Sequence, residues 1–323
     1  MFPKFRVAAY LFHFLAEEDL VLPRNKSNLM RGALGAAWVR YICPHHHKKQ
    51  QHDKNCGFLR WFRGSVVDAP KVYSGESNLP SWTLYCPTEG KKIQKGEIIT
   101  LVMTFFGLEA VTDGFVHFVI AAESIKSIGP KGDQGSIKLY LIEAFSPYSQ
   151  EAVPVYNSGT GEWGSPLMYN WAQIQQFAGF WDSSLLRLDF FTPTRIITGG
   201  DLVKIPAFDI VFEAHLRRAL AILQIHCSED VSEVDVFGLL ELSKQVELVE
   251  SEVKWVDWSR RSARQKSTMN LGGFVGSAVY SGDFKPFEPW LALIPWLSVG
   301  KATTFGNGVA VTYNVSVQTL DSL

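Results

Sequence analysis

The chain has 323 residues, which is enough for one large domain or two ordinary ones. A hydrophobic content of 46% excludes an intrinsically disordered chain, because so much apolar surface can be buried in a packed core. The formal net charge of −1 excludes a generally basic nucleic-acid binder, so any RNA site must be a local concentration of Lys and Arg.

The cysteines and the apolar runs favour a cytoplasmic protein. Four cysteines, at positions 43, 56, 86 and 227, are too few and too widely spaced for a disulfide scaffold, so a reducing cytoplasm is the expected location. No apolar run approaches the roughly 18 residues of a membrane span, and no membrane partner is expected. Met1–Ala16 has the apolar character of a signal peptide but lacks a small-residue cleavage site before Glu17, so we interpret it as a buried first strand.

The first half of the sequence predicts a strand, a helix and a glycine-rich loop that enters a further strand. Phe5–His13 is a nearly continuous apolar run, which indicates a strand. Asn28–Tyr41 is expected to form a helix with Ser27 as its N-cap. Ile128–Gly135 is a loop rich in glycine that runs into an expected strand at Ile137–Leu141.

The second half repeats this order. A connector rich in Pro and Gly begins near Phe145 and includes a short amphipathic helix at Met168–Phe180, and we place a domain boundary near Asp182. Leu185–Phe191 then predicts a strand and Ala207–Ile225 a helix. The order of strand, helix, further strands, glycine loop and final strand therefore occurs twice, which predicts an α+β protein with two halves of similar plan.

The last long stretch, Asn270–Val311, closes the second half. We expect it to contain a strand at Phe274–Tyr280, a turn with a positive φ at Gly282, an apolar helix or half-helix at Phe287–Leu297 and a loop that enters a final strand at Val309–Val315. The loop is the part of this stretch with the clearest functional chemistry.

That loop is Gly300–Gly308, with the sequence GKATTFGNG. Its glycines allow close approach to the backbone, while its lysine and threonines add a positive charge and hydroxyl donors, a combination that suits a phosphate backbone. It is not a P-loop, because Lys301 follows the first glycine and the loop leads into a strand. A glycine-rich hairpin without a ligand is the alternative.

A second basic segment is Lys254–Lys266. It holds five basic residues and one acidic residue, interleaved with Trp255 and Trp258. Basic side chains for the backbone and aromatic faces for the bases are the pattern of RNA recognition. The alternative is a charged surface with core tryptophans.

Several blocks occur in a fixed order along the chain. They are RGALG at 31–35, CGFLRWF at 56–62, TPTR at 192–195, WVDWSRRSARQ at 255–265, LGGFVGSAVYSGDFKPF at 271–287 and LSVGKATTFGNG at 297–308. With these blocks the sequence resembles the CRISPR-associated endoribonucleases of the RAMP superfamily, which cut precursor crRNA at its repeats.

The resemblance implies a fold of two tandem ferredoxin-like (RRM-like) domains, residues 1–182 and 183–323, the second carrying the glycine-rich loop. It also implies an endoribonuclease without metal or cofactor, in which the ribose 2′-hydroxyl attacks the scissile phosphate and leaves a 2′,3′-cyclic phosphate. Such an enzyme stays bound to the repeat hairpin of its crRNA. The implied partners are CRISPR repeat RNA and other subunits of a CRISPR effector complex, of a type III-like or type IV-like subtype.

Two family positions lack their expected catalytic histidine. Members often carry histidine directly after RGALG and just before the final VGK, where this chain has Ala36 and Ser298. A histidine cluster in CPHHHKKQQHDKNC, at 43–56, is the expected substitute, because histidine titrates near neutral pH and can serve as base or acid. Two other interpretations stay open: a solvated surface segment, or a zinc site formed by Cys43, Cys56 and histidines.

Arginine offers a second catalytic route, since it clamps phosphate and can align the 2′-hydroxyl, and type IV relatives rely on arginines. The candidate catalytic residues are His45, His46, His47, Tyr41, Arg31 and Arg40. The candidate RNA-binding residues are Arg24, Lys48, Lys49, Trp258, Arg260, Arg261, Arg264, Lys266, Gly300, Lys301, Thr303 and Thr304.

Two further functions stay open. One is an RNA-holding subunit of the same family that has lost catalysis, which Ala36 and Ser298 would explain. The other is a RAMP backbone subunit that packs along the guide, although such subunits seldom carry the carboxy-terminal loop. The remaining histidines with apolar neighbours are expected to be structural, and they are His13, His117, His215 and His226.

Overall fold

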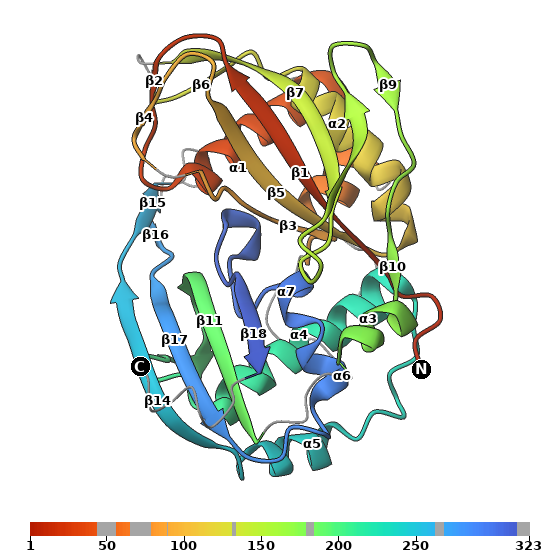
Figure 1. The fold of residues 1–323 in the computed structure, drawn as a ribbon, viewed down its shortest axis with the longest axis vertical. Coiled ribbons are helices and arrows are strands. Elements are labelled where there is room, and N and C mark those ends of the chain that lie inside the picture. The colour runs from red at the N-terminus through yellow and green to blue at the C-terminus, as the bar shows by residue number, and fades with distance from the viewer. Residues whose placement is uncertain are drawn as a thin grey trace. The chain divides into compact units, whose positions relative to one another are not determined.

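The structure is a computed structural model that describes residues 1–43, 56–64, 79–88, 90–130, 134–178, 184–261 and 268–314 (Figure 1). Its contacts divide the chain into two compact units, residues 1–170 with 222–229, and residues 171–221 with 230–323. The domain limit suggested by the sequence, near Asp182, stays a prediction, and Asp182 lies outside the described residues. Among the helices that the structure describes, none is both long and apolar enough to cross a lipid bilayer.

The first unit is built on an antiparallel sheet whose long strands follow the order β3, β5, β1, β7. The strands of this unit are β1 (Arg6–Ala16), β2 (Leu20–Val21), β3 (Trp82–Tyr85), β4 (Lys92–Ile93), β5 (Ile98–Phe106), β6 (Ser127–Ile128), β7 (Gly135–Phe145), β8 (Ala152–Asn157), β9 (Glu162–Trp163) and β10 (Tyr169–Asn170). Its helices are α1 (Lys26–Ala37) and α2 (Phe115–Glu123), with wide π-helical turns η1 (Trp38–Ile42), η3 (Phe58–Arg63) and η4 (Ala110–Gly114).

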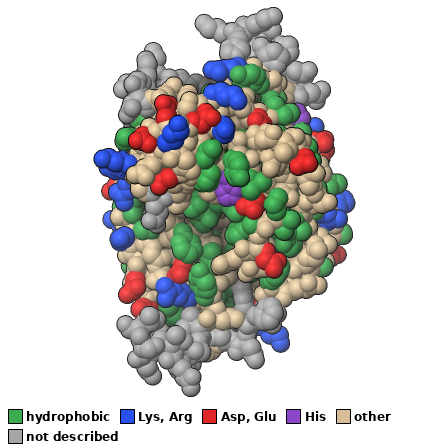
Figure 2. Space-filling model, turned by 45° about the horizontal axis from the view of Figure 1, so that its top comes forward, with side chains coloured by type: hydrophobic (Ala, Val, Ile, Leu, Met, Phe, Trp, Pro, Cys, Tyr) green, Lys and Arg blue, Asp and Glu red, His purple; other side chains and the backbone are tan. Residues whose placement is uncertain are grey.

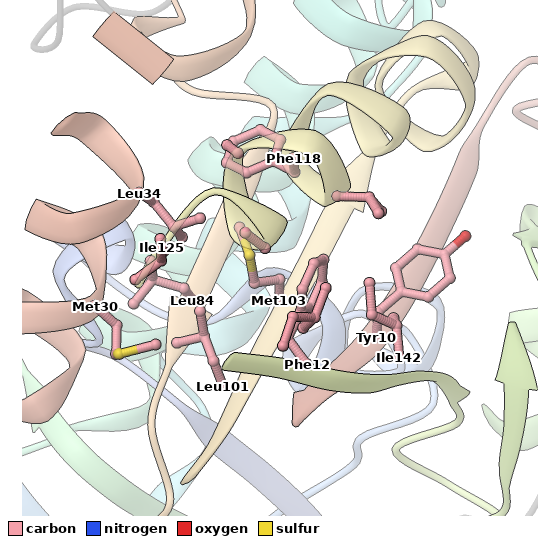
Figure 3. Packing of buried hydrophobic residues seen from close by; sticks show 14 of the residues in the cluster. Tyr10, Phe12, Met30, Leu34, Leu84, Leu101, Met103, Phe118, Ile125 and Ile142 are labelled. Atoms are coloured by element: carbon pink, nitrogen blue, oxygen red, sulfur yellow. The ribbon is translucent and has the colours of Figure 1, made fainter. Parts of the chain in front are cut away.

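Alternating side chains of β1 build the core of this unit. Tyr10, Phe12 and Phe14 are fully buried and share one face of the sheet, because side chains two residues apart on a strand point the same way. Helices α1 and α2 cover this face (Figure 1), and Figure 3 shows Phe118 of α2 among the buried side chains of the sheet. Each such aromatic or aliphatic side chain stabilises the fold by about 1.5–3 kcal/mol through its burial.

Helix α1 confirms the expected first helix but not its N-cap. The side chain of Asn25 accepts the hydrogen bond from the Asn28 N–H at 2.9 Å, so Asn25 rather than Ser27 is the cap. The Ser27 hydroxyl instead accepts from the Cys86 N–H at 2.9 Å. At the other end the helix widens into η1, where the Cys43 N–H donates to the Trp38 carbonyl at 3.0 Å.

The second unit has a four-stranded antiparallel sheet in the order β14, β17, β11, β18. Its strands are β11 (Leu185–Thr194), β12 (Ile197–Thr198), β13 (Asp201–Leu202), β14 (Glu247–Val256), β15 (Ser259–Arg261), β16 (Thr268–Asn270), β17 (Gly273–Ser281) and β18 (Ala310–Asn314). Its helices are α3 (Trp171–Ala178), most of α4 (Phe208–Cys227), α5 (Val236–Ser243), α6 (Glu288–Leu291), α7 (Ile294–Leu297) and the short 3₁₀ turn η5 (Thr303–Phe305).

The structure refines one expectation for the last stretch and contradicts another. The apolar segment expected to be a helix or half-helix at Phe287–Leu297 is divided into α6 and α7, and each has a proline as its second residue, which has no N–H to continue a preceding helix. Gly282 does not have a positive φ. The packing there is tight, since a Cβ at Gly282 would lie 3.0 Å from the Val246 side chain.

The two units share one topology. Counted along the chain, the four main strands of each unit lie in the sheet order 2-3-1-4: β3, β5, β1, β7 in the first and β14, β17, β11, β18 in the second. A helix follows the first strand in both, α1 after β1 and α4 after β11. This arrangement is the ferredoxin-like β-α-β-β-α-β plan, so the expected α+β class with two ferredoxin-like domains is confirmed.

Candidate nucleic-acid interface

The glycine-rich loop of the second unit lies along the end of β11. The Gly308 N–H donates to the Pro193 carbonyl at 3.1 Å, and the Lys301 N–H donates to the Arg195 carbonyl at 2.9 Å. The Val309 N–H donates to the hydroxyl of Thr192 at 2.9 Å. The loop and the TPTR segment therefore form one hydrogen-bonded structure, although their sequences lie more than a hundred residues apart.

Two side chains attach this structure to the Gly272–Gly273 pair. The buried Asn307 amide donates to the Leu271 carbonyl at 2.8 Å, and the Arg195 guanidinium donates to the Gly272 carbonyl at 3.1 Å. Gly273 packs so closely that a Cβ there would lie 2.4 Å from the Thr194 carbonyl oxygen. Three segments, 192–195, 271–273 and 299–309, are thus fixed against one another.

The loop glycines are required by backbone geometry. Gly300 and Gly308 both have a φ of +79°, and a Cβ on Gly308 would lie 2.0 Å from the Val299 carbonyl oxygen. Ala302, with a φ of 64°, and Ser298, with φ 62° and ψ 169°, hold left-handed conformations that side-chain-bearing residues rarely adopt. The residues that flank Gly300 are therefore strained, and the surrounding hydrogen bonds hold them in place.

The exposure of the loop corrects one part of the predicted interface. Thr303 and Thr304 are buried, with 4% and 7% of their surface exposed, so their hydroxyls do not form the open donor surface that the sequence suggested. Lys301 is half-buried, and none of the ion pairs among the described residues involves it. Lys301 therefore keeps a partly exposed side chain for the role that the sequence predicts.

The basic tryptophan segment joins the same end of the sheet. The Leu271 N–H donates to the Trp258 carbonyl at 2.9 Å, and beyond this bond β15 pairs with β16 in the register Arg260 to Met269. Trp258 is half-buried. Arg264 and Lys266 lie outside the described residues, while Arg260 and Arg261 are on β15.

Acidic side chains lie in the middle of this sheet. Arg187 Nε lies 2.7 Å from Asp189 Oδ1, and this hydrogen bond, with Glu252 and Glu250 nearby, raises the pKa of Arg187. The single guanidinium among three carboxylates leaves a negative field, which repels a phosphate backbone. Arg195 and Lys301 lie instead beyond the Thr194 end of β11. Basic and acidic side chains are otherwise interspersed on the face shown in Figure 2.

Helix α4 holds the residues that precede the glycine-rich loop, a role that the sequence did not reveal. The buried Arg218 donates through Nε to the Leu297 carbonyl at 2.7 Å, directly before Ser298. His215 donates through Nε2 to the Trp290 carbonyl at 2.8 Å, and complete burial lowers the pKa of His215 to about 4. A neutral histidine and a buried arginine therefore fix the residues that precede the strained Ser298.

In the first unit, the structure separates the candidate arginines. The Arg31 guanidinium lies over the rings of Phe62 and Trp82, at 5.3 and 5.9 Å from the ring centres, so it packs against the aromatic core. Arg40 lies 5.8 Å from the ring centre of Tyr41, and both side chains are exposed. Arg24 is exposed as well. The candidates that lie outside the described residues are His45, His46, His47, Lys48 and Lys49.

The zinc hypothesis stays a prediction. Cys43 and Cys56 do approach one another, with 3.3 Å between their sulfur atoms. In the described part of the chain, however, no three His, Cys, Asp or Glu side chains gather as metal ligands do. The four histidines between the two cysteines lie outside that part.

The histidines expected to be structural have partners within the fold. His13 lies between Glu143 and Thr100, at 2.9 and 3.0 Å from their oxygens. His117 donates to the Asp113 carbonyl at 2.7 Å and stacks on Trp38, and His226 donates to the Leu79 carbonyl at 2.8 Å. Together with His215, all four are held as the sequence suggested.

Two protein-family models match parts of the sequence. Residues 188–310 match the family model of CRISPR-associated endoribonuclease Cas6, and residues 5–167 match a family model described as an N-terminal domain. No protein of curated function matches the sequence significantly.

Solved structures agree in fold. Thermus thermophilus Cas6 is 14% identical with a TM-score of 0.56, over 95% of this chain and 98% of that one. The Cas6 chain of a product complex is 16% identical with a TM-score of 0.57, over 95% of this chain and 100% of that one. A chain of a partial Cas6-RT-Cas1–Cas2 complex is 11% identical with a TM-score of 0.60, over 98% of this chain and 47% of that one.

Proposed function

The chain belongs to the family of CRISPR-associated endoribonuclease Cas6, and we propose that it binds CRISPR repeat RNA and cleaves it without a metal ion to give mature crRNA. The observation that carries the proposal is the glycine-rich loop braced by Asn307 and Arg195, which lies within the region that matches the Cas6 family model. This braced loop gives the RNA backbone a rigid surface with one available lysine.

The proposed interface reads the RNA from one end of the second sheet. Lys301 and Arg195 supply positive charge on rigid backbone, and Arg260, Arg261 and Trp258 on or beside β15 supply further charge and an aromatic face. Phosphate contacts of this kind set the position of the RNA, while stacking on aromatic rings holds unpaired bases.

The proposed reaction is an internal transesterification. A base removes the proton from the ribose 2′-hydroxyl, the 2′-oxygen attacks the adjacent phosphate, and an acid protonates the departing 5′-oxygen, leaving a 2′,3′-cyclic phosphate and a 5′-hydroxyl. We assign base or acid to the histidines at 45–47 and the stabilisation of the phosphorane charge to Arg40, with Tyr41 beside it. Arg31 is assigned a supporting role, because its guanidinium packs on Phe62 and Trp82.

A second candidate function is a crRNA-holding subunit that does not cleave. One observation favours it: Ser298, which stands where relatives often carry histidine, is 5% exposed and fixed in a strained conformation, so it offers no acid or base to RNA. In either function we propose a cytoplasmic location, continued binding of the repeat hairpin after processing, and assembly with other CRISPR effector subunits.

The test uses the full chain and its own CRISPR repeat RNA. The repeat and a scrambled RNA of equal length and composition are incubated with excess protein, and products are resolved at single-nucleotide resolution. We expect one discrete cut in the repeat and none in the scrambled RNA. Tight, selective binding of the repeat without a cut would establish the holding subunit, and equal binding of both RNAs would contradict both functions.

A further inference from the structure

Two cysteine thiols of the first unit are in direct contact. The Sγ atoms of Cys43 and Cys56 lie 3.3 Å apart, and neither residue is in a disulfide. Cys43 ends η1, and Cys56 comes just before η3. The contact joins two segments whose ends lie on either side of residues 44–55, the stretch that carries the candidate histidines.

The contact is held by the aromatic core rather than by chance proximity on the surface. The Cys43 N–H donates to the carbonyl of the fully buried Trp38 at 3.0 Å, and the Cys56 carbonyl accepts from the Arg60 N–H at 2.9 Å. Between them, a Cβ on Gly57 would lie 3.6 Å from the Trp38 ring, so the backbone after Cys56 rests on that ring. The two thiols are therefore positioned by η1 and η3, which both contribute buried aromatic side chains to the core.

The difference in exposure between the two cysteines predicts which thiol reacts first. Cys43 is buried, with 1% of its surface exposed, whereas Cys56 is partly exposed. A reagent in solution therefore reaches Cys56 first, and the sulfur of Cys43 is already in contact to resolve the product. A disulfide needs about 2.05 Å between its sulfurs, so the two atoms must approach by roughly 1 Å.

We propose that Cys43 and Cys56 are a reversible dithiol–disulfide pair that is oxidised by a low-molecular-weight disulfide such as oxidised glutathione. The Cys56 thiolate attacks a sulfur of oxidised glutathione, forming a mixed disulfide and releasing one glutathione thiolate. The Cys43 thiolate then attacks Cys56 Sγ, forming the Cys43–Cys56 bond and releasing the second glutathione. The pair loses two electrons and two protons, and one oxidised glutathione becomes two reduced ones.

The other two cysteines provide an internal comparison. Burial raises the pKa of Cys86, and burial raises that of Cys227 to about 12, so both carry little thiolate at neutral pH. Neither lies in a cysteine pair among the described residues. They should therefore stay reduced when Cys43 and Cys56 react.

The experiment maps the thiols of the full chain without RNA, so its outcome is independent of the proposed function. The folded protein is treated with oxidised glutathione, denatured with an alkylating agent, digested and analysed by mass spectrometry. We expect a Cys43–Cys56 cross-linked peptide that has lost two hydrogens and is restored by dithiothreitol, with Cys86 and Cys227 alkylated. In Cys43→Ser, which removes the resolving thiol, glutathione should remain on Cys56.

Three outcomes would overturn the proposal. They are alkylation of both Cys43 and Cys56 in the treated wild-type protein, glutathione retained on wild-type Cys56, and disulfides that join two chains. Cys86→Ser is the matched control, because it also removes one thiol of the first unit and should leave the Cys43–Cys56 cross-link unchanged.

Discussion

The side-chain amide of Asn307 donates a 2.8 Å hydrogen bond to the carbonyl of Leu271, 36 residues earlier in the chain. Through this bond the glycine-rich loop and the Gly272–Gly273 pair form one structure, to which the end of β11 is also joined through Arg195. The loop therefore braces the strand ends, and in the proposed function it also binds RNA, so its mutants should affect both stability and binding.

Asn307→Ala should destabilise the second unit by about 1–3 kcal/mol, because the buried Leu271 carbonyl loses its partner. It should also weaken binding of the repeat RNA, since the loop is no longer fixed. Urea unfolding and a filter-binding titration measure the two effects. Gln94→Ala, which removes an exposed amide in the first unit, is the control and should change neither. Full stability in Asn307→Ala would contradict the bracing role.

Lys301→Ala should lower RNA affinity on the order of tenfold and reduce the slope of log affinity against log salt by about one phosphate contact. Its backbone N–H still bonds to Arg195, so the loop itself should stay folded. Binding is measured across a salt series. The control is Lys285→Ala, an exposed lysine of the same unit, and an unchanged slope in Lys301→Ala would remove the loop from the interface.

Acid should destabilise the second unit through His215. Complete burial lowers the pKa of this histidine from 6.5 to about 4, opposed in part by its hydrogen bond to the Trp290 carbonyl. The unfolded chain therefore binds a proton between these pH values while the folded chain does not, and stability is lost as the pH falls from about 6.5 to about 4. The loss should be up to about 3 kcal/mol. Melting temperatures of wild type and His215→Gln across this range provide the test, and equal pH slopes would contradict the assignment.

The sequence predicted much of the fold because its signals are local. The nearly continuous apolar run Phe5–His13 and the helical spacing of Ala207–Ile225 correspond to β1 and α4, and the repeated order of elements corresponds to two sheets of equal topology. Even so, the N-cap of α1 was misassigned, because Ser27 and Asn25 are both good caps and only the partner of Ser27, the Cys86 N–H, decides between them.

The site was less predictable, because its bonds connect distant segments. Arg218 reaches the Leu297 carbonyl 79 residues away, and no local pattern marks such a pair. Thr303 and Thr304 have hydroxyl groups that could donate to phosphate, yet the loop folds inward and buries both residues. Arg195 is in the TPTR block, and that block is the signal in the sequence that could have marked it as a candidate.

Changing His45, His46 and His47 together to Ala should lower the cleavage rate on the order of 10²–10⁴-fold and leave RNA binding nearly intact, if a histidine acts as base or acid. The rate of the wild type should fall as the pH drops through the histidine pKa if the base is limiting. Single-turnover rates are compared with those of Arg40→Ala. Normal cleavage by the triple variant together with loss in Arg40→Ala would assign catalysis to the arginine clamp.

The most direct test of the central claim removes one hydroxyl group from the substrate. Repeat RNA with a single 2′-deoxy nucleotide at the scissile position is incubated with the protein in EDTA beside the unmodified RNA, and product ends are analysed. We expect the unmodified repeat to be cut to a 2′,3′-cyclic phosphate and the deoxy substrate to be bound with equal affinity but left intact. Cleavage of the deoxy substrate, or cleavage of the unmodified repeat only after Mg²⁺ is restored, would contradict metal-independent attack by the 2′-hydroxyl.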